Sequence, residues 1–600
     1  MNPKSTLHPR EIKNVSINHE ELSIEKLLSV SRYFARVAPF EGPKRQKVDA
    51  VRKYVEENWL SDSAQPRYGF NTGIGSLKGV KISQDNIEKF QQHYVKSHSV
   101  GVGEPLAVEI VRGAMLIQAN ALSMGFSGVR ALVVDKLIEM LNKKVHPVVP
   151  EQGSLGASGD LAPLTHIASV LVGEDDAEIW IGSRRAKISE LTEASGAISF
   201  EQEGRTISFE PIRLQGKEAV SLTNSTAVML AVAAHLVFDA EVVLKNADIS
   251  GALSLEAMMC EASAFSEDLH RLRNQVGQIN TAKNISALVQ NSKRMTSEAR
   301  LQYFQTTTGR QLNEKLKDSP LKEFVSEISR YKKEHEFEKD RIQDAYSLRC
   351  IPQVHGACKD AFNYVKNIVN LELSAVTDNP VIFPERREDG FVARSGGNFH
   401  GEPLALAMDF LSIALSEIGS IAERRLFRML SPGMSFGLPR NLSGGEVGVN
   451  SGYMIVQYTA AQLVAENKIL AHPASVDSIP TSDNQEDHVS MGLTAARKCL
   501  RIAKNVQYLI AMEYLCAVQG LHLSALEASV NFEKFPLGAG TTLAFDFLRN
   551  WKIKSGNSEK YPFQLMRDDE YVKTKIEIMR ALCAEGTIVN EVEKRVKLLV

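Results

Sequence analysis

The chain has 600 residues, of which 44% are hydrophobic and 24% charged, and its formal net charge is −2 at pH 7. This is the composition of a soluble globular protein with a large core, and the near-neutral charge gives no indication of binding to nucleic acid or to an anionic membrane surface. Six cysteines are widely spaced and form no CxxC pair, so we interpret them as reduced, mostly buried thiols of a cytoplasmic protein.

The N-terminal part of the chain is predicted to be mixed in secondary structure. Residues 1–14 are polar, carry no apolar segment of a secretory signal, and are predicted to be disordered. From 15 to 220, short helical patterns alternate with glycine-rich loops, which predicts a mixed α+β region. Near 178–212, Ile, Trp, Thr and Phe alternate with polar residues around single glycines, which predicts a small group of strands.

Helical patterns dominate the chain from residue 221 onward. The apolar run Ala227–Phe238 has twelve residues, which is too short to cross a bilayer and favours a buried core helix. After Gly401, apolar residues recur every three or four positions until Ser431-Pro432-Gly433, which predicts one helix of about 28 residues. Residues 450–471 and 492–519 show the same one-sided pattern.

These patterns together predict a mainly α fold, with a core of long bundled helices and a smaller mixed α+β N-terminal region. We expect the central bundle over residues 221–530 and a C-terminal helical region over 531–600. Within the bundle, residues 297–340 are rich in Lys, Glu, Arg and Gln, and we interpret them as an exposed helical insertion. Helices this long and this apolar on one side also favour packing against other subunits.

The most informative segment is a loop of small residues, GSLGASGD at 153–160, that leads into a predicted helix. Asp160 suits the N-cap of that helix, and Pro163 suits its first turn. Taken alone, a loop of this composition is most often a flexible connection between two elements.

The tripeptide Ala157-Ser158-Gly159 inside this loop offers a second interpretation. Glycine at the third position lets the backbone turn tightly, with no Cβ in the way. The Gly159 amide nitrogen can then attack the carbonyl carbon of Ala157 with loss of water, and loss of a second water from Ser158 leaves an exocyclic methylidene. The product, 4-methylidene-imidazol-5-one, is a strong electrophile made without an added cofactor, and its formation uses strain of the kind that proteins store at functional sites.

Other motifs follow in a fixed order along the chain. They are YGFNTG at 68–73, KE at 217–218 with Asn224, QDAYSLRCIPQ at 343–353, TDNP at 377–380, SGGNFHG at 395–401, and PASVDSIPTS at 473–482 followed by NQEDH at 484–488. With these motifs and the Ala-Ser-Gly loop, the chain resembles the histidine and aromatic amino acid ammonia-lyase family over roughly residues 20–550. Two positions depart from the family pattern, because Ala219 and Ser225 stand where glycine is usual.

The resemblance implies the ammonia-lyase fold, a methylidene-imidazolone formed autocatalytically from Ala157, Ser158 and Gly159, and no external cofactor. It also implies a homotetramer whose active sites combine residues of several subunits. The expected partner is a small amino acid substrate, with no nucleic acid and no membrane, and the expected location is the cytoplasm. We expect no metal, because His93 and His98 are five residues apart and do not share one helix face as a two-histidine zinc site would.

The resemblance further assigns roles to individual residues. Tyr68 matches the base that removes the β-proton, and since a free phenol titrates near pH ~10, the site has to lower its pKa or couple the proton transfer tightly. Arg349 matches the residue that holds the substrate carboxylate through two parallel hydrogen bonds. The other residues surround cofactor and substrate: Asn224 and Gln343 as groups that stabilise developing negative charge, Tyr346 as a further polar group, and Phe399 as an apolar wall.

Two positions favour histidine as the substrate. Ser97-His98 resembles the pair found in histidine lyases, whereas phenylalanine and tyrosine lyases tend to carry Phe-Leu or His-Leu there. Glu486 stands where those lyases usually show Gln. An imidazole ring carries a donor and an acceptor, and a phenyl ring would leave polar partners such as His98 and Glu486 unpaired. The expected reaction is therefore elimination of ammonia from L-histidine to give trans-urocanate, the first step of histidine degradation.

Two alternatives stay open at this point. A tyrosine or phenylalanine ammonia-lyase, or a 2,3-aminomutase of the same family, shares the scaffold, and His98 can equally hydrogen-bond a tyrosine phenol. A non-enzymatic helical scaffold would keep the fold without the condensed tripeptide. A dinucleotide site is rejected, because Lys78 occupies the position of the third glycine after Gly73-Ile74-Gly75.

Overall fold

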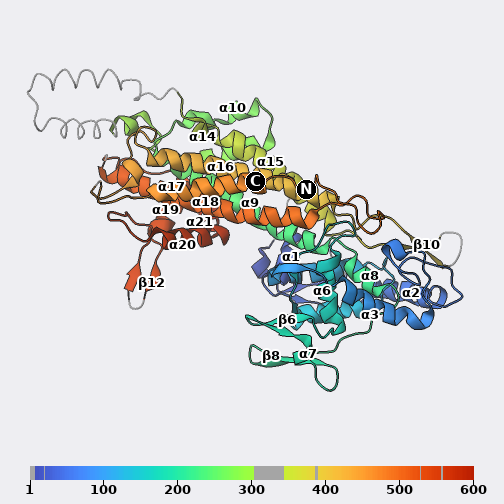
Figure 1. Cartoon of the computed structure of the whole chain (residues 1–600). Coiled ribbons are helices and arrows are strands. Elements are labelled where there is room, and N and C mark those ends of the chain that lie inside the picture. Colours follow the sequence, from blue (N-terminus) through green and yellow to red (C-terminus); the bar gives the residue numbers. More distant parts are fainter. Residues whose placement is uncertain are drawn as a thin grey trace, which may run out of the picture. The chain divides into compact units, whose positions relative to one another are not determined.

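The computed structural model describes residues 7–18, 21–302, 343–385, 390–446, 448–527, 529–555 and 558–600 (Figure 1). The chain divides into two compact units, each made of three segments that are far apart in sequence. The first unit contains Met1–Phe238, Val365–Asp409 and Pro473–Leu500, and the second contains Asp239–Tyr364, Phe410–His472 and Arg501–Val600. Long helices dominate the described residues, which confirms the predicted mainly α fold.

The first unit contains short helices and small strands. Its helices are η1 Pro9–Glu11, α1 Ile24–Ser31, α2 Pro43–Asn58, η2 Gly75–Leu77, η3 Gln84–Asn86, α3 Ile87–His98, α4 Val108–Ser123, α5 Ala131–Asn142, α6 Leu161–Val172, α7 Ile188–Leu191 and α8 Glu218–Thr223. Its strands are β1 Asn14–Val15, β2 Arg36–Val37, β3 Val102–Pro105, β4 His146–Pro147, β5 Pro150–Gln152, β6 Glu178–Ile181, β7 Arg184–Lys187, β8 Ile198–Gln202, β9 Arg205–Phe209, β10 Val381–Glu385 and β11 Gly390–Arg394.

The second unit is mostly helical. It holds η4 Ala262–Phe265, α10 Glu267–Arg271, α11 Val276–Leu288, α14 Tyr346–Arg349, η5 Arg440–Leu442, α17 Met454–Leu470, α19 Ala539–Arg549, α20 Val572–Ala584, α21 Thr587–Glu593 and the strands β12 Ile553–Ser555 and β13 Ser558–Lys560. Four long helices have residues in both units: α9 Ala227–Ala257, α15 Ile351–Glu372, α16 Glu402–Leu430 and α18 Gly492–Glu527.

The described strands form only small ribbons. β1 and β2 pair in parallel, and the antiparallel groups are β3–β5, β4–β6–β7, β8–β9, β10–β11 and β12–β13. β6 to β9 confirm the strands predicted near 178–212. In β8, Ile198 and Phe200 are buried while the serine between them is partly exposed, which is the alternation of a half-buried strand.

The long helices begin and end close to the predicted positions. α16 ends at Leu430, directly before Ser431-Pro432-Gly433, because proline removes a backbone N–H donor and its ring clashes with the preceding turn. α17 and α18 correspond to the patterns at 450–471 and 492–519. α9 extends far beyond the twelve-residue apolar run, to Ala257, and polar residues of its second half such as Asn246, Asp248 and Glu256 are buried with the apolar ones.

Three described segments are long and apolar enough to cross a membrane by length and composition: Glu218–Ala257, Glu402–Leu430 and Gly492–Leu526. The twelve-residue apolar run is therefore only part of a longer apolar segment, Glu218–Ala257. Buried residues make up 78%, 67% and 83% of the most apolar windows of these segments. The apolar side chains of these helices are thus largely used in packing within the protein.

Two predicted segments fall partly or wholly beyond the described residues. The charged segment 297–340 lies outside them from residue 303 onward. The description of the chain begins at Leu7, and η1 lies inside the segment 1–14 that we predict to be disordered. The pyrrolidine ring of Pro9 is buried, and the His8 ring lies 6.0 Å from that of Tyr33.

Three helices of the first unit hold the residues of chemical interest. α6 packs against both α3 and α8. α6 begins directly after the Ala-Ser-Gly segment, α3 ends at His98, and α8 ends one residue before Asn224. Helix ends, rather than helix faces, therefore present the functional side chains.

Candidate active site

A cavity of about 900 Å³ lies within the first unit, and we call it the main cavity. Seven residues predicted from the sequence line it: Tyr68, His98, Ala157, Ser158, Asn224, Phe399 and Glu486. They come from loop 68–78, the ends of α3 and α8, the loop before α6, and the segments 395–400 and 481–488. The fold thus gathers these residues from most of the length of the first unit.

The loop before α6 is held by the buried carboxylate of Asp160. The position of this residue is predicted correctly, but its hydrogen-bond partners are not the predicted ones. Asp160 is the N-cap residue of α6, as predicted, yet its side chain does not cap that helix. Its Oδ2 accepts instead from the backbone N–H groups of Val228 (3.0 Å) and Met229 (2.8 Å), in the first turn of α9. Ser154 Oγ donates to Oδ1 at 2.9 Å. Burial raises the pKa of Asp160 to about 6, against the lowering effect of these hydrogen bonds.

The Ala-Ser-Gly turn requires glycine at its third position. Gly159 has φ +69°, in the left-handed region, and a Cβ added there would lie 2.3 Å from the carbonyl oxygen of Ser225. The same Ser225 oxygen accepts from the Asp160 N–H at 2.8 Å. Ser225 stands where the resembled family commonly has glycine, and its buried hydroxyl is hydrogen-bonded to Thr377 Oγ1 (3.0 Å).

The hydroxyl of Ser158 donates to Glu486 Oε1 at 2.9 Å. Thr481 Oγ1 donates to the other oxygen, Oε2, at 3.3 Å. Thr481 and Glu486 are also joined by two backbone hydrogen bonds of 3.0 and 3.2 Å across a turn. All three residues 482–484 inside that turn have positive φ, between 53° and 61°, so the turn is strained and its ends are closely fixed.

Tyr68 lies partly buried in the main cavity, and its hydroxyl accepts a hydrogen bond from the Gly75 N–H at 3.1 Å. Burial raises the pKa of Tyr68 above the ordinary phenol value, and the Glu486 carboxylate adds to this, while the Gly75 hydrogen bond opposes it. The surroundings that one chain provides therefore do not lower this pKa. A tyrosine can act as a base if its pKa is lowered or if its proton transfer is tightly coupled to the reaction. These surroundings favour the second way.

His98 ends α3, and its ring stacks on that of Tyr94 with centroids 3.9 Å apart. Its Nδ1 lies 2.9 Å from the Tyr94 carbonyl oxygen. Because a carbonyl can only accept, Nδ1 carries the hydrogen and Nε2 is left as an acceptor. Burial lowers the pKa of His98, which keeps the ring neutral. The main cavity thus receives an acceptor from His98 as well as the carboxylate of Glu486.

Asn224 is buried just beyond the end of α8, and its Nδ2 donates to the Asn379 carbonyl at 3.2 Å. Asn379 also lines the cavity, and its Oδ1 accepts from the Gly396 N–H at 2.7 Å. One hydrogen of the Asn224 amide is therefore used to hold the TDNP segment in place. The other is not engaged by any hydrogen bond found among the described residues.

Four predicted site residues are not among those that line the main cavity: Gly159, which lies in the turn beside it, and Gln343, Tyr346 and Arg349 of the second unit. Gln343 and Arg349 line a second cavity, of about 250 Å³, in the second unit. Tyr346 is 72% exposed, and the Arg349 guanidinium lies 4.6 Å from the centre of its ring. Arg349 Nε donates to the Asp344 carbonyl at 2.9 Å. Arg349, the predicted partner of the substrate carboxylate, is therefore not among the described residues that line the main cavity.

Comparisons with known proteins show the family to which the chain belongs. The family model described as aromatic amino acid lyase matches residues 22–549. The chain belongs to the aromatic amino acid lyase family. It is 41% identical over 590 residues to the histidine ammonia-lyase of Alkaliphilus oremlandii, which covers 98% of this chain and 100% of that protein. It is 42% identical over 565 residues to histidine ammonia-lyase 2 of Fusobacterium nucleatum, covering 94% and 97%.

Solved structures show the same family relationship. The tyrosine aminomutase of Streptomyces globisporus matches with a TM-score of 0.79 and 30% identity, over 98% of this chain and 100% of that one. The histidine ammonia-lyase of Trypanosoma cruzi matches with a TM-score of 0.77 and 30% identity, over 97% and 96%. The resemblance predicted from the motifs, and the fold class that it implied, are confirmed.

In this member of the family, buried charges anchor α8. The ammonium of Lys217, which is fully buried, donates to Asp378 Oδ2 at 2.6 Å and to Ser221 Oγ at 3.0 Å. Burial lowers the pKa of Lys217, and the Asp378 carboxylate opposes that shift. This ion pair joins the start of α8 to Asp378 of the TDNP segment. The next residue of that segment, Asn379, accepts a hydrogen bond from Asn224.

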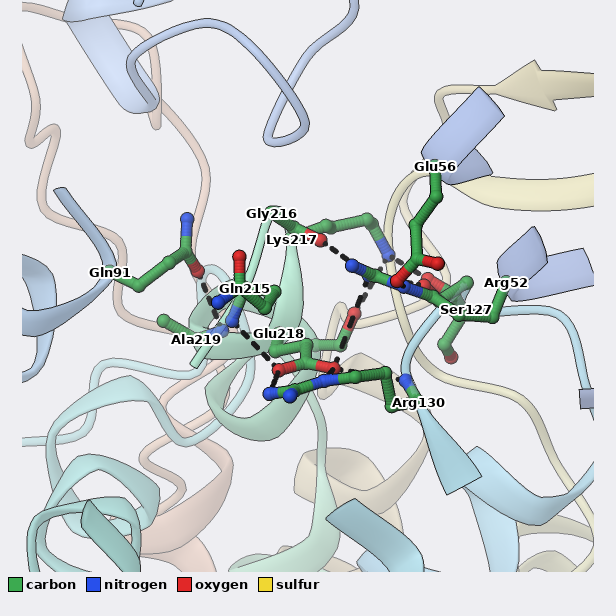
Figure 2. A network of polar contacts seen from close by, with 12 residues as sticks. Arg52, Glu56, Gln91, Ser127, Arg130, Gln215, Gly216, Lys217, Glu218 and Ala219 are labelled. Atoms are coloured by element: carbon green, nitrogen blue, oxygen red, sulfur yellow. Dashed lines mark hydrogen bonds and ion pairs between the residues drawn. The ribbon is translucent and has the colours of Figure 1, made fainter. Parts of the chain in front are cut away.

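The carboxylate of the neighbouring Glu218 is also fully buried, and Figure 2 shows it beside the guanidinium of Arg130. It accepts from Nε (2.8 Å) and NH2 (2.6 Å) of Arg130 and from the backbone N–H of Gln215 (2.8 Å). The N–H of Ala219 donates to Gln91 Oε1 at 2.9 Å. Three successive residues thus fix the start of α8, and with it the position of Asn224 at the other end.

We expect Lys217→Met to destabilise the protein, because it leaves the Asp378 carboxylate buried without its partner. The loss should be about 3–5 kcal/mol, the range found when one member of a buried pair is removed. The double variant Lys217→Met/Asp378→Leu should recover part of that loss, since no charge then stays buried. Urea unfolding of the three proteins measures this, and a double variant less stable than Lys217→Met would contradict it.

Sequence reasoning missed the residues that support the site. Tyr94 received no role, although it sits one turn before His98 and so shares its helix face. Thr481 lies inside a quoted motif but received no role. The side chain of Asp160 was assigned to the wrong helix. In each case the supporting residue is close in sequence to a recognised one.

Proposed function

We propose that this chain is a histidine ammonia-lyase that converts L-histidine to trans-urocanate and ammonia. Its relatives of that name are about 40% identical over nearly their whole length. The observation that carries the substrate assignment is the pair of acceptors, His98 Nε2 and the Glu486 carboxylate, that the cavity presents beside Ser158. An imidazole N–H can pair with either group, whereas a phenyl ring would leave both unpaired.

Ala157, Ser158 and Gly159 are the proposed source of the methylidene-imidazolone. The turn fits this role, since Gly159 has left-handed φ and lies against the Ser225 backbone, where a side chain has no room. Once formed, this group supplies an electrophile that makes the substrate amine a better leaving group. Tyr68 is the proposed base for the β-proton, and its hydroxyl is held toward the cavity by the Gly75 N–H.

Absorbance assays test the reaction and its substrate. Incubation with L-histidine should give the spectrum of urocanate, while L-tyrosine and L-phenylalanine should give little coumarate or cinnamate. Preferred turnover of L-tyrosine would overturn the histidine assignment and leave the family assignment intact.

One alternative is favoured by a specific observation. His98 Nε2 can also accept from a phenol O–H, and a tyrosine aminomutase is among the matching structures at 30% identity. Such an enzyme would re-add ammonia at Cβ and give a β-amino acid, which does not absorb as urocanate or coumarate does. Chromatography of the products from L-tyrosine separates this alternative from the lyase.

We expect His98→Leu to lower kcat/KM for L-histidine by roughly 100-fold or more, because leucine offers the ring no hydrogen-bond acceptor. The same change should improve the relative turnover of L-phenylalanine. His93→Leu is the matched control, because His93 lies on the same helix, is exposed and does not line the cavity. If both variants lose activity equally, the specificity role of His98 is wrong.

A homotetramer that completes the active site is also proposed. It would allow Gln343, Tyr346 and Arg349 of one subunit to serve the cavity of another, which one chain leaves without its carboxylate partner. In the second unit, exposed apolar side chains on α16 and α17 suit such packing: Phe410, Ile413, Ile455, Tyr458 and Ile469 are 45–75% exposed. Light scattering of the purified protein tests the subunit number, and a stable, active monomer would contradict it.

A cytoplasmic location is proposed as well. All six cysteines are free thiols, and free thiols are typical of proteins kept in a reducing compartment. Fractionation of the source cells tests this.

A further inference from the structure

The buried side chain of Tyr94 contacts both His98 and Thr223, the last residue of α8. We infer that Tyr94 is a positioning residue for substrate selection, because it holds the His98 ring in one plane and so keeps Nε2 directed at the ring of the substrate. This inference deepens the proposed function and rests on it, since His98 has to be the group that recognises the substrate ring. Tyr94 acts through His98 and transfers no proton itself.

The stack with Tyr94 fixes the plane of the His98 ring. The two ring centroids are 3.9 Å apart, and the ring planes are inclined by only 19°. The two residues are four positions apart on α3, so their side chains lie on the same helix face. A ring held nearly flat against its neighbour cannot tilt without losing that contact. The stack therefore restrains the tilt that would swing Nε2 away from its place in the main cavity.

Hydrogen bonds decide which ring nitrogen of His98 is left for the substrate. Nδ1 lies 2.9 Å from the Tyr94 carbonyl oxygen and 3.0 Å from Ser97 Oγ. The Ser97 hydroxyl donates to the same carbonyl oxygen at 3.2 Å, so its own oxygen can accept from Nδ1–H. A half-turn of the imidazole would keep the stack but exchange the two nitrogens and break these contacts. The stack and the hydrogen bonds together therefore leave one orientation for the ring.

A hydrogen bond at the far end of the Tyr94 side chain keeps the phenol itself in place. Its hydroxyl lies 2.9 Å from Thr223 Oγ1, and both residues are buried. Because Thr223 Oγ1 donates to the Ala219 carbonyl oxygen of its own helix at 3.0 Å, the Tyr94 hydroxyl is the donor. Burial raises the pKa of Tyr94, which keeps this hydrogen on the phenol. The ring that carries His98 is thus attached to α8, one residue before Asn224.

Steady-state kinetics of two Tyr94 variants test the role of the stack. Tyr94→Leu keeps an apolar side chain that suits a helix but removes the flat ring. We expect it to lower kcat/KM for L-histidine by about 10-fold, the upper end of what one aromatic stack contributes. The loss should lie in KM rather than kcat, because the His98 hydrogen bond is made to the bound substrate and to the transition state alike. Tyr94→Phe keeps the stack and should stay within about threefold of wild type.

The double variant Tyr94→Leu/His98→Leu shows whether Tyr94 acts through His98. His98→Leu alone is expected to lose roughly 100-fold in kcat/KM. Since no imidazole is then left to orient, adding Tyr94→Leu should change kcat/KM by less than about twofold. Independent effects would multiply to a loss of roughly 1,000-fold, and that result would overturn the inference.

Val95→Ala is the matched control for damage to the helix. Val95 is buried on α3 next to Tyr94 and is not among the residues that line the main cavity. This variant should lose stability and keep the wild-type kcat/KM. If Val95→Ala and Tyr94→Leu lose kcat/KM equally, helix packing rather than ring orientation is responsible, and the inference is wrong.

The outcomes separate this inference from the proposed function. If Tyr94→Leu does not fold by circular dichroism, Tyr94→Met takes its place, because its unbranched side chain fills irregular space without a flat ring. If wild-type chain turns over L-tyrosine and not L-histidine, the proposed substrate is wrong, and the same cycle run with L-tyrosine decides whether Tyr94 orients His98. A folded Tyr94→Leu that matches wild type on the preferred substrate would overturn the inference alone. A wild-type chain that turns over neither substrate would overturn both.

Discussion

Ser158→Ala is expected to abolish ammonia release from L-histidine. Alanine has no hydroxyl to lose, so the exocyclic alkene cannot form and the substrate amine stays a poor leaving group. Removal of the covalent group from other enzymes lowers kcat by roughly 10⁴- to 10⁶-fold, and we expect a loss of that size or below detection. Urocanate formation, followed by absorbance at saturating L-histidine, is the measurement.

The fold should survive this change. Ser158 makes one side-chain hydrogen bond, to Glu486, at the edge of a cavity, so its removal costs about 1 kcal/mol of stability. Ser158→Ala should therefore unfold close to the wild-type denaturant concentration and keep the wild-type subunit number. A folded variant that still forms urocanate at more than a hundredth of the wild-type rate would mean that another group supplies the electrophile.

Tyr68→Phe is expected to lower kcat by roughly 10²- to 10⁴-fold, the contribution of a positioned general base. Phenylalanine keeps the ring but removes the oxygen that Gly75 holds toward the cavity. The variant should still show the two-water mass deficit, because Tyr68 has no contact with the Ser158 hydroxyl among the hydrogen bonds of the described residues. A normal mass deficit with a large fall in kcat separates loss of the base from loss of the electrophile.

The pH dependence of kcat should also show that Tyr68 is the base. Since burial raises the pKa of Tyr68 above its ordinary value, the phenolate fraction increases with pH throughout the neutral and alkaline range. We expect kcat for L-histidine to rise toward alkaline pH as long as the protein stays folded, and this rise should disappear in Tyr68→Phe. An identical alkaline profile in both proteins would remove Tyr68 from the role of base.

The sequence predicts the helices well where local signals are strong. α16 combines a three-to-four spacing of apolar residues with a proline–glycine stop, and both signals act within the helix itself. β6 to β9 are similarly marked by alternation and by glycine turns. The extent of α9 was harder to predict, because its continuation to Ala257 depends on burial by distant segments rather than on a local pattern.

The candidate site was also predicted only in part. Motifs identify Tyr68, Ser158 and Glu486, but not which atoms face one another. The Ser158–Glu486 hydrogen bond spans 328 residues of chain, and the partners of Asp160 lie in the first turn of α9, 68 and 69 residues away. Contacts of that kind are created by tertiary packing, for which a single sequence carries no periodic signal.

Gln343, Tyr346 and Arg349, which lie on α14 or just before it, show most clearly what a sequence motif cannot predict. Motif order places Arg349 in the same site as Ser158, whereas Arg349 lines a cavity of the other unit. A sequence motif reports that a residue belongs to a function, but it does not report whether one chain or several must supply it. This distinction is set by packing between subunits, which the homotetramer proposal addresses.

The most direct test of the account is the intact mass of freshly purified, folded wild-type protein. We predict a chain lighter than its translated sequence by two waters, with the deficit confined by peptide mapping to the segment that contains Ala157, Ser158 and Gly159. A folded chain of full mass that nevertheless converts L-histidine to urocanate would contradict the central claim that this enzyme makes its electrophile from its own backbone.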